Sequence, residues 1–201
     1  MNTITEKQYI KPATGQDADL HELIKARYSP RAFQDKEIPE KEIKLLLEAA
    51  RWAPSSMNAQ PWRFLYAFKG ENSYELMTQS LMEGNKPWAS NAPILLLSMI
   101  KTTMDNGTAN HSANHDLGLA IGNLTIQAQE LGIGIHQMGG FSKASIIELF
   151  KLPADIVPVT ISALGYYGYP DQLEEPFRSR EKAIRTRKPL EEIAYHGELK
   201  F

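Results

Sequence analysis

The sequence predicts a single globular domain that combines helices with strands. Its 201 residues are 42% hydrophobic and 9% aromatic, which is enough for one well-packed core. Apolar residues recur at helical spacing in several segments, most clearly between His111 and Leu131. Between such segments lie short apolar runs such as Ile94 to Ile100, typical of strands covered on both faces. We treat 1–201 as one unit, with 1–16 as a polar N-terminal lead-in and 171–201 as a C-terminal arm.

Charge and composition exclude several classes of partner and chemistry. A formal net charge of −2 gives no reason to expect nucleic acid or an anionic membrane as a partner. Cysteine is absent, which excludes disulfides, thiolate nucleophiles and cysteine-ligated metal. The N-terminus has no apolar leader, and no apolar run approaches the roughly 18 residues that span a bilayer. We therefore expect a cytoplasmic protein with no nucleic-acid or membrane partner.

The first motif lies between Arg27 and Phe33, where two arginines and a serine share five residues. A helix predicted over 18–28 brings Arg27 near its end, and Pro30 then turns the chain so that Arg31 lies beside Arg27. Guanidinium groups match phosphate oxygens, and Ser29 adds a hydroxyl. The segment therefore indicates a phosphate site, although two solvated arginines in a surface turn are the alternative. The inner face of this helix is expected to carry Leu20, Leu23, Ile24 and Arg27.

A second helix begins at Pro39-Glu40 and stops at Pro54. The loop that follows, 54–61, holds polar side chains between two prolines, directly before a predicted strand at 62–68. Because prolines stiffen the loop, its serine and amide groups can read the edge of a flat heterocycle. The alternative is a connector whose polar groups satisfy its own backbone.

The middle of the chain alternates helices with strands. We predict a helix over 73–84, a loop over 87–93, the buried strand 94–100 and a polar, mobile segment over 101–110. The longest helix, 111–131, is expected to be thin on one side because of three small residues, Gly118, Ala120 and Gly122. This thinness permits close approach of another helix, and we expect that helix to be its copy in a dimer. His111 and His115 lie four residues apart but lack the pattern of a zinc site, so we assign no metal.

The last part of the chain contains a glycine pair and a basic run. A short strand over 133–138 leads into Gly139-Gly140, where backbone N–H groups can approach a ligand. The alternative is a tight turn into a helix capped by Ser142. His136 is expected to be a core histidine. A final strand covers 157–164, and a basic segment follows at 178–188, more often a solvated arm than a site.

In this order, the motifs resemble the FMN-dependent nitroreductase family. They are R-Y-S-P-R-A-F at 27–33, A-P-S-S-M-N-A-Q-P-W at 53–62, the small-residue helix, M-G-G-F at 138–141 and R-T-R-K-P-L-E-E at 185–192. The resemblance covers 20–193. It implies an α+β sandwich with a mostly antiparallel central sheet flanked by helices, and a homodimer with two FMN sites at its interface.

The resemblance also implies which residues bind the cofactor. The N-terminal motif would contact the FMN phosphate and ribityl chain, joined by basic residues of the tail: Arg27, Tyr28, Ser29, Arg31, Arg185 and Arg187. The partner subunit would lend the loop that touches the flavin ring: Pro54, Ser55, Ser56, Asn58 and Gln60. The backbone near flavin N5 would come from the glycine segment, with Gly140 in support: Met138, Gly139 and Gly140.

The function implied is an NAD(P)H oxidoreductase that reduces nitroaromatic, quinone or similar acceptors by ping-pong hydride transfer through FMN. The protein would contribute no acid, base or nucleophile, and Arg31 would stabilise negative charge on the ring. NADH or NADPH would be the electron donor. Two alternatives stay open at this point: a flavin-dependent dehalogenase on the same fold, and a non-catalytic flavin-binding regulatory dimer.

Overall fold

A computed structural model describes residues 9–15 and 19–199 and has an antiparallel sheet at its centre. The four strands are arranged in the order β1-β2-β4-β3. Every neighbouring pair is antiparallel, which confirms the expected α+β sandwich. The strands are β1 (Trp62–Phe68), β2 (Ile94–Lys101), β3 (Ile133–Met138) and β4 (Ile156–Tyr166).

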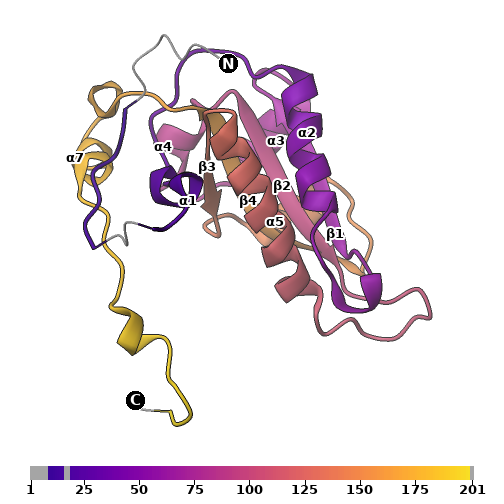
Figure 1. Cartoon of the computed structure of the whole chain (residues 1–201). Coiled ribbons are helices and arrows are strands. Elements are labelled where there is room, and N and C mark those ends of the chain that lie inside the picture. Colours follow the sequence, from indigo (N-terminus) through magenta and orange to yellow (C-terminus); the bar gives the residue numbers. More distant parts are fainter. Residues whose placement is uncertain (1–8, 16–18, 200–201) are drawn as a thin grey trace.

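Helices cover both faces of this sheet (Figure 1). On one face α2 (Glu40–Arg51) and α5 (Ala113–Glu130) pack against each other and against the strands. The other face is covered by α3 (Asn72–Ser80) and α6 (Lys143–Leu149), with the single turn α4 (Lys86–Ala89) at its edge. The sheet is thus the middle layer of a sandwich.

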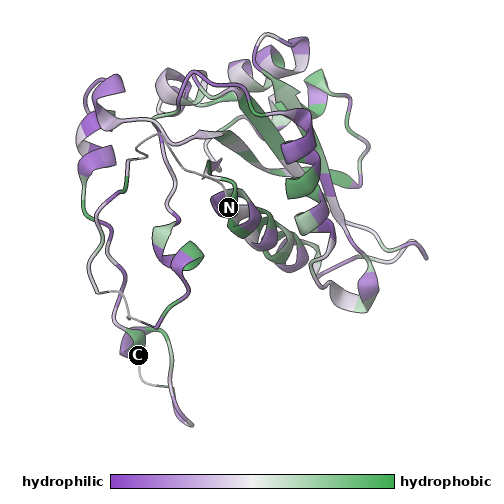
Figure 2. Ribbon diagram, turned by 45° about the horizontal axis from the view of Figure 1, so that its top comes forward, coloured by the Kyte–Doolittle hydropathy of each residue, from purple (hydrophilic) through white to green (hydrophobic). Residues whose placement is uncertain are grey.

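The sequence 94–100 is apolar at nearly every position because both faces of strand β2 are buried. Alternate side chains of a strand point to opposite faces. Leu95 and Leu97 enter the core shared with α3 and α6, whereas Ile94 and Leu96 enter the core shared with α2 and α5. Figure 2 shows the resulting hydrophobic sheet between helices with hydrophilic outer surfaces.

The long helix α5 differs from its expected geometry in one respect. Ala120 is fully buried against the sheet, whereas Gly118 and Gly122 are exposed on the opposite side. The three small residues therefore do not share a face, and that prediction was wrong. Residues four apart lie on one helical face, so Gly118 and Gly122 alone form the thin surface.

Two other helices are shorter than predicted. Helix α1 spans only Glu22–Ala26, and Leu20 and Ile24 are exposed instead of lining an inner face. Arg27 ends the helix in an extended conformation. Helix α3 ends at Ser80 because Leu81 becomes extended and pairs with Phe141.

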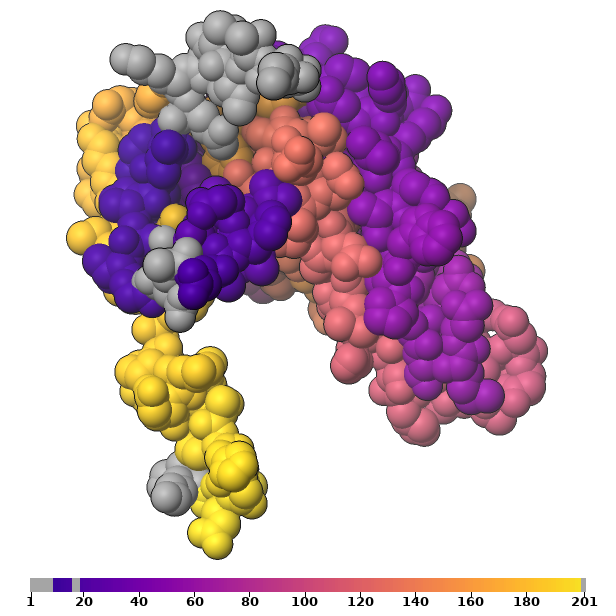
Figure 3. All heavy atoms as spheres, viewed as in Figure 1, coloured from indigo at the N-terminus to yellow at the C-terminus, as the bar shows by residue number. Residues whose placement is uncertain are grey.

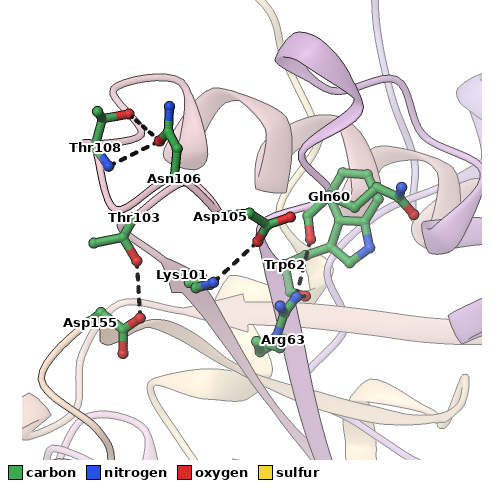
Figure 4. Close-up of polar contacts among 9 residues, drawn as sticks. All are labelled: Gln60, Trp62, Arg63, Lys101, Thr103, Asp105, Asn106, Thr108 and Asp155. Atoms are coloured by element: carbon green, nitrogen blue, oxygen red, sulfur yellow. Dashed lines mark hydrogen bonds and ion pairs between the residues drawn. The ribbon is translucent and has the colours of Figure 1, made fainter.

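The polar segment 101–110 is a closed hairpin (Figure 4). Thr103 pairs with Ala109, and the Met104 N–H donates to the Thr108 carbonyl over 2.8 Å. The Thr103 hydroxyl also donates to Asp155 over 3.0 Å, which ties the hairpin to the start of β4. The segment therefore has a defined hairpin conformation, and its mobility stays a prediction.

An N-terminal segment, residues 11–14, runs beside residues 180–185. Ala13 pairs with Arg185, and the Lys11 ammonium donates to the Arg180 carbonyl over 2.8 Å. The arm predicted at 171–201 therefore begins as a packed segment with η2 (Pro170–Gln172) and α7 (Phe177–Lys182). Beyond it, η3 (Leu190–Glu192) and its flanking residues project from the body (Figure 3). Of the predicted lead-in at 1–16, residues 1–8 and 16 lie outside the described ranges.

Candidate functional site

The segment 27–31 lies against the sheet beside β3. Tyr28 is buried and stacks on Tyr167 with ring centroids 4.8 Å apart. Pro30 is buried against Gly134, where a Cβ would overlap the proline ring and come within 2.8 Å of Tyr167. Ser29, between these two anchors, is exposed. The anchors press the segment onto the sheet and leave its serine facing outward.

Side chains from distant parts of the chain hold the backbone of this segment at successive residues. The Arg185 guanidinium donates to the Arg27 carbonyl over 2.7 Å, and the Tyr28 ring stacks on the Tyr167 ring. These contacts fix the first half of the segment. Because hydrogen bonds to charged groups contribute more than neutral ones, the arginine contact is a strong one.

The second half is held in the same way. The His136 ring approaches the Pro30 carbonyl at 2.9 Å, and the Arg31 N–H donates to the Glu181 carboxylate over 3.0 Å. Since a carbonyl can only accept, Nδ1 of His136 carries the proton. Burial, followed by the charge of Arg31, lowers the pKa of His136 to about 4, so the ring is neutral near pH 7.

Three guanidinium groups converge near the segment. Burial is the largest cause of the lowered pKa of Arg27, and the charge of Arg187 adds to it. Burial also lowers the pKa of Arg185, and both Arg27 and Arg187 act in the same direction. Mutual repulsion of this kind is relieved by a bound anion, and arginine is the side chain best matched to phosphate.

The arginines differ in how their donors are used. Arg185 is engaged with backbone carbonyls, donating to Lys25 over 2.9 Å and to Lys11 over 3.2 Å, besides Arg27. Arg187 is exposed and donates to the carbonyl of the neighbouring Thr186 over 2.7 Å. We therefore regard Arg27 and Arg187 as the better phosphate ligands, with Arg185 supporting their placement.

Arg31 occupies a different environment from the other arginines. Its side chain is 23% exposed, and its guanidinium lies 5.6 Å from the centre of the Trp88 ring. Trp88 in turn packs on His136, with ring centroids 4.3 Å apart. The aromatic pair orients Arg31 beside β3 and limits the contact of its charge with water.

The glycine pair follows the end of β3, on the strand that carries His136. The Gly140 carbonyl accepts hydrogen bonds from the Met82 N–H and from Asn85, each over 3.0 Å. A Cβ at Gly140 would come within 2.7 Å of the Asn85 amide, whereas open space surrounds the corresponding position of Gly139. The backbone is therefore fixed on one side and accessible on the other. Met138 itself is buried.

Hydrogen bonds within the loop 54–60 and to helix α5 define the conformation of this loop. The Ser55 hydroxyl accepts a hydrogen bond from the Gln60 N–H over 3.0 Å. The Ser56 N–H donates to the buried Asp116 of α5 over 3.2 Å. Asn58 and Gln60 adopt positive φ values of 54° and 44°, which are uncommon for residues other than glycine. Pro54, Ser55 and Ser56 also line a hollow with His111, His115 and Leu119.

This loop does not meet the segment 27–31 within one chain. In Figure 1 the loop lies beyond the lower end of α2, at the opposite end of the molecule from α1. The structure thus brings together the N-terminal segment and the basic tail, packs that segment on the strand β3 that leads to the glycine pair, and leaves 54–60 apart. Sequence reasoning missed Glu181 and Trp88 as parts of the arginine environment, because their partners lie far away in the chain.

Comparison with known proteins decides the family. A family model described as "Nitroreductase family" matches residues 24–166. The chain belongs to the nitroreductase family. The matched region contains the arginine segment, the serine loop and the glycine pair, and it confirms the resemblance described from the motifs.

Individual relatives agree with this membership. The chain is 27% identical over 177 residues to a provisionally named NADH dehydrogenase/NAD(P)H nitroreductase of Methanothermobacter thermautotrophicus, covering 83% of this chain and 89% of the relative. It is 27% identical over 188 residues to an iodotyrosine deiodinase of Thermotoga neapolitana, covering 83% and 96%. A crystal structure of an oxidoreductase containing FMN has 32% identity and a TM-score of 0.87, covering 97% of this chain and 99% of that chain.

The described residues contain no cluster of three or more His, Cys, Asp or Glu side chains placed to hold a metal. Among those same residues, no helix has both the length and the apolar character needed to cross a bilayer.

Proposed function

We propose that this chain is an FMN-dependent NAD(P)H oxidoreductase that reduces nitroaromatic, quinone or similar acceptors. The observation that carries the proposal is the placement of Arg27, Arg185 and Arg187 at one backbone segment, where Arg185 donates to the Arg27 carbonyl over 2.7 Å and the three like charges repel one another. The relative described as an NAD(P)H nitroreductase and the solved oxidoreductase containing FMN support the same assignment.

The residues present fit FMN in three respects. Arg27 and Arg187 offer positive charge to a terminal phosphate, and Ser29 presents an exposed hydroxyl between Arg27 and Arg31. The open side of Gly139 leaves room for a ring to approach the backbone. Arg31, held beside Trp88, would place a positive charge where negative charge accumulates on the ring. When bound, FMN would supply the chemistry, taking a hydride from NAD(P)H and passing electrons to the acceptor.

We further propose that two chains share each site. Loop 54–60 is shaped by Ser55 and Asp116 but lies away from the arginine segment of its own chain. A second chain can bring its loop to the ring, and in return receive the loop of the first, as in any two-fold symmetric interface.

A flavin-dependent dehalogenase is the second candidate. The observation that favours it is the iodotyrosine deiodinase of Thermotoga neapolitana, 96% of whose length is covered by the match. The two functions differ in the acceptor. A turnover screen that supplies quinones, nitroaromatics and iodotyrosine separately therefore distinguishes them.

Steady-state oxidation of NADH and of NADPH tests the proposal. The purified protein should be yellow, release FMN on denaturation, and oxidise a reduced nicotinamide when a quinone is present. A protein that binds FMN but transfers no electrons to any acceptor of the panel would be a non-catalytic flavin carrier. One that stays colourless in excess FMN would refute the assignment.

A further inference from the structure

Glu181 on α7 is a buried carboxylate that contacts the arginine segment from behind. Its side chain is fully inaccessible to solvent, and one oxygen, Oε1, accepts the Arg31 N–H over 3.0 Å. The other oxygen, Oε2, lies 3.8 Å from the Arg31 guanidinium and makes no hydrogen bond. One side chain thus holds both the backbone and the charge of Arg31.

A carboxylate in this place is unfavourable for binding an anion by charge alone. It partly neutralises Arg31 and would repel a nearby phosphate. Burying it without full hydrogen bonding costs free energy as well. Burial raises the pKa of Glu181, while the Arg31 N–H, Lys11 and Arg31 itself act against that rise. The hydrogen bond to the Arg31 N–H is what this residue offers in return, since it fixes the turn after Pro30.

We propose that Glu181 is a positioning residue of the flavin site, and that it sets the affinity for the FMN phosphate by holding the turn 29–32, and with it the exposed Ser29 hydroxyl between Arg27 and Arg31, in its binding conformation. The inference rests on the proposed function. It makes α7 part of the binding machinery although none of its residues needs to touch the ligand. Exchange of Glu181 for a residue that keeps the acceptor oxygen preserves the turn, and loss of that oxygen releases it.

Paired titrations with FMN and riboflavin test this, because riboflavin lacks the phosphate. The variants are Glu181→Gln, which retains an acceptor oxygen, Glu181→Ala, which removes it, and Glu181→Asp, which keeps the charge but shortens the reach. Glu174→Gln removes an exposed charge from the same segment and is the matched control. Each apo-protein is titrated with both flavins by fluorescence quenching, alongside its circular dichroism spectrum and melting temperature.

Glu181→Ala should weaken FMN binding by roughly ten- to hundredfold, the loss expected for one charge-assisted contact, with little change for riboflavin. Glu181→Asp should weaken FMN binding as Glu181→Ala does. The FMN affinity of Glu181→Gln should stay within about threefold of those of the parent and of Glu174→Gln, a change well under the loss of such a contact. If the alanine variant does not fold, the aspartate and glutamine variants provide the same contrast.

Three results would overturn the inference: unchanged FMN affinity in a folded Glu181→Ala or Glu181→Asp, equal losses for FMN and riboflavin, or failure of Glu181→Gln to retain binding. A parent protein that binds neither flavin would instead refute the proposed function.

Discussion

Pro30 packs its ring directly on Gly134, leaving no room for a side chain at the glycine. A Cβ there would overlap Pro30 Cγ and come within 2.8 Å of Tyr167. We predict that Gly134→Ala lowers the free energy of unfolding by about 1 to 3 kcal/mol, the usual cost of overpacking, and also weakens FMN binding. Urea denaturation and an FMN titration measure the two effects.

The control for that substitution is Gly84→Ala in an exposed turn, where a Cβ meets open space. It should leave the free energy of unfolding within about 0.5 kcal/mol of the parent, as surface substitutions usually do. A Gly134→Ala protein as stable as the parent would show that the turn can move aside, and that the contact does not position it.

The arginine cluster leads to a prediction about affinity. Arg27→Ala and Arg187→Ala should each weaken FMN binding by roughly ten- to hundredfold, since each removes a charge-assisted contact of about 1.5 to 3 kcal/mol. Arg51→Ala, an exposed arginine paired with Glu48 on α2, is the matched control and should bind FMN normally. If Arg187→Ala binds as tightly as the parent, the tail is only a solvated arm.

A related prediction separates Arg31 from these two residues. Once resaturated with FMN, Arg27→Ala should recover most of its rate of flavin reduction, whereas Arg31→Ala should stay slow if Arg31 stabilises charge on the ring. Anaerobic stopped flow with NADH and with NADPH measures the rate. Equal recovery of both variants would assign Arg31 to binding alone.

The lowered pKa of His136 predicts that the stability of the protein depends on pH. Its pKa falls from about 6.5 in the unfolded chain to about 4 in the folded protein. Between these values the unfolded state binds more protons, so stability is complete above the unfolded pKa and falls as the pH drops toward the folded one. The loss can reach roughly 3 kcal/mol.

The measurement is urea unfolding of the parent and of His136→Gln at pH 7 and at pH 4.5. Acidic groups titrate in both proteins, so the difference between them isolates the histidine. The parent should lose more stability than the variant over this interval. Equal losses would show that His136 is protonated in the folded state without penalty.

Shared sites predict complementation between two defective chains. Arg27→Ala damages the arginine segment, and Asn58→Gly removes an amide from the loop while tolerating its positive φ of 54°. If the loop acts in the partner's site, mixing the two variants after mild dissociation restores about a quarter of the sites, because half of the random dimers are mixed and each has one intact site. Flavin binding that stays at the level of the separate variants would place the loop and the arginines in one chain's own site.

Local pattern was sufficient for much of the fold. Strands β1 and β3 begin and end where their apolar and aromatic residues predicted, and the Ser142 cap begins α6 as expected. Helix α1 was overextended because Leu20 and Ile24 have helical spacing, although the actual single turn leaves them in water. Periodicity alone does not say which side of a helix the rest of the chain covers.

The candidate site was predictable only where its residues are close in sequence. Two arginines and a serine within five residues are a visible signal, as is a pair of glycines. Glu181 stands among basic residues 150 positions from Arg31, and only folding brings its carboxylate to that backbone. The role of Arg185 was hidden in the same way, because its acceptors are carbonyls, which every residue has.

Titration of the apo-protein with FMN, riboflavin and FAD, followed by flavin fluorescence, tests the central claim most directly. Binding of one FMN per chain, with riboflavin much weaker and FAD excluded, is the result expected of a site in which Arg27 and Arg187 hold a terminal phosphate. A protein that binds FMN no more tightly than riboflavin would contradict that site.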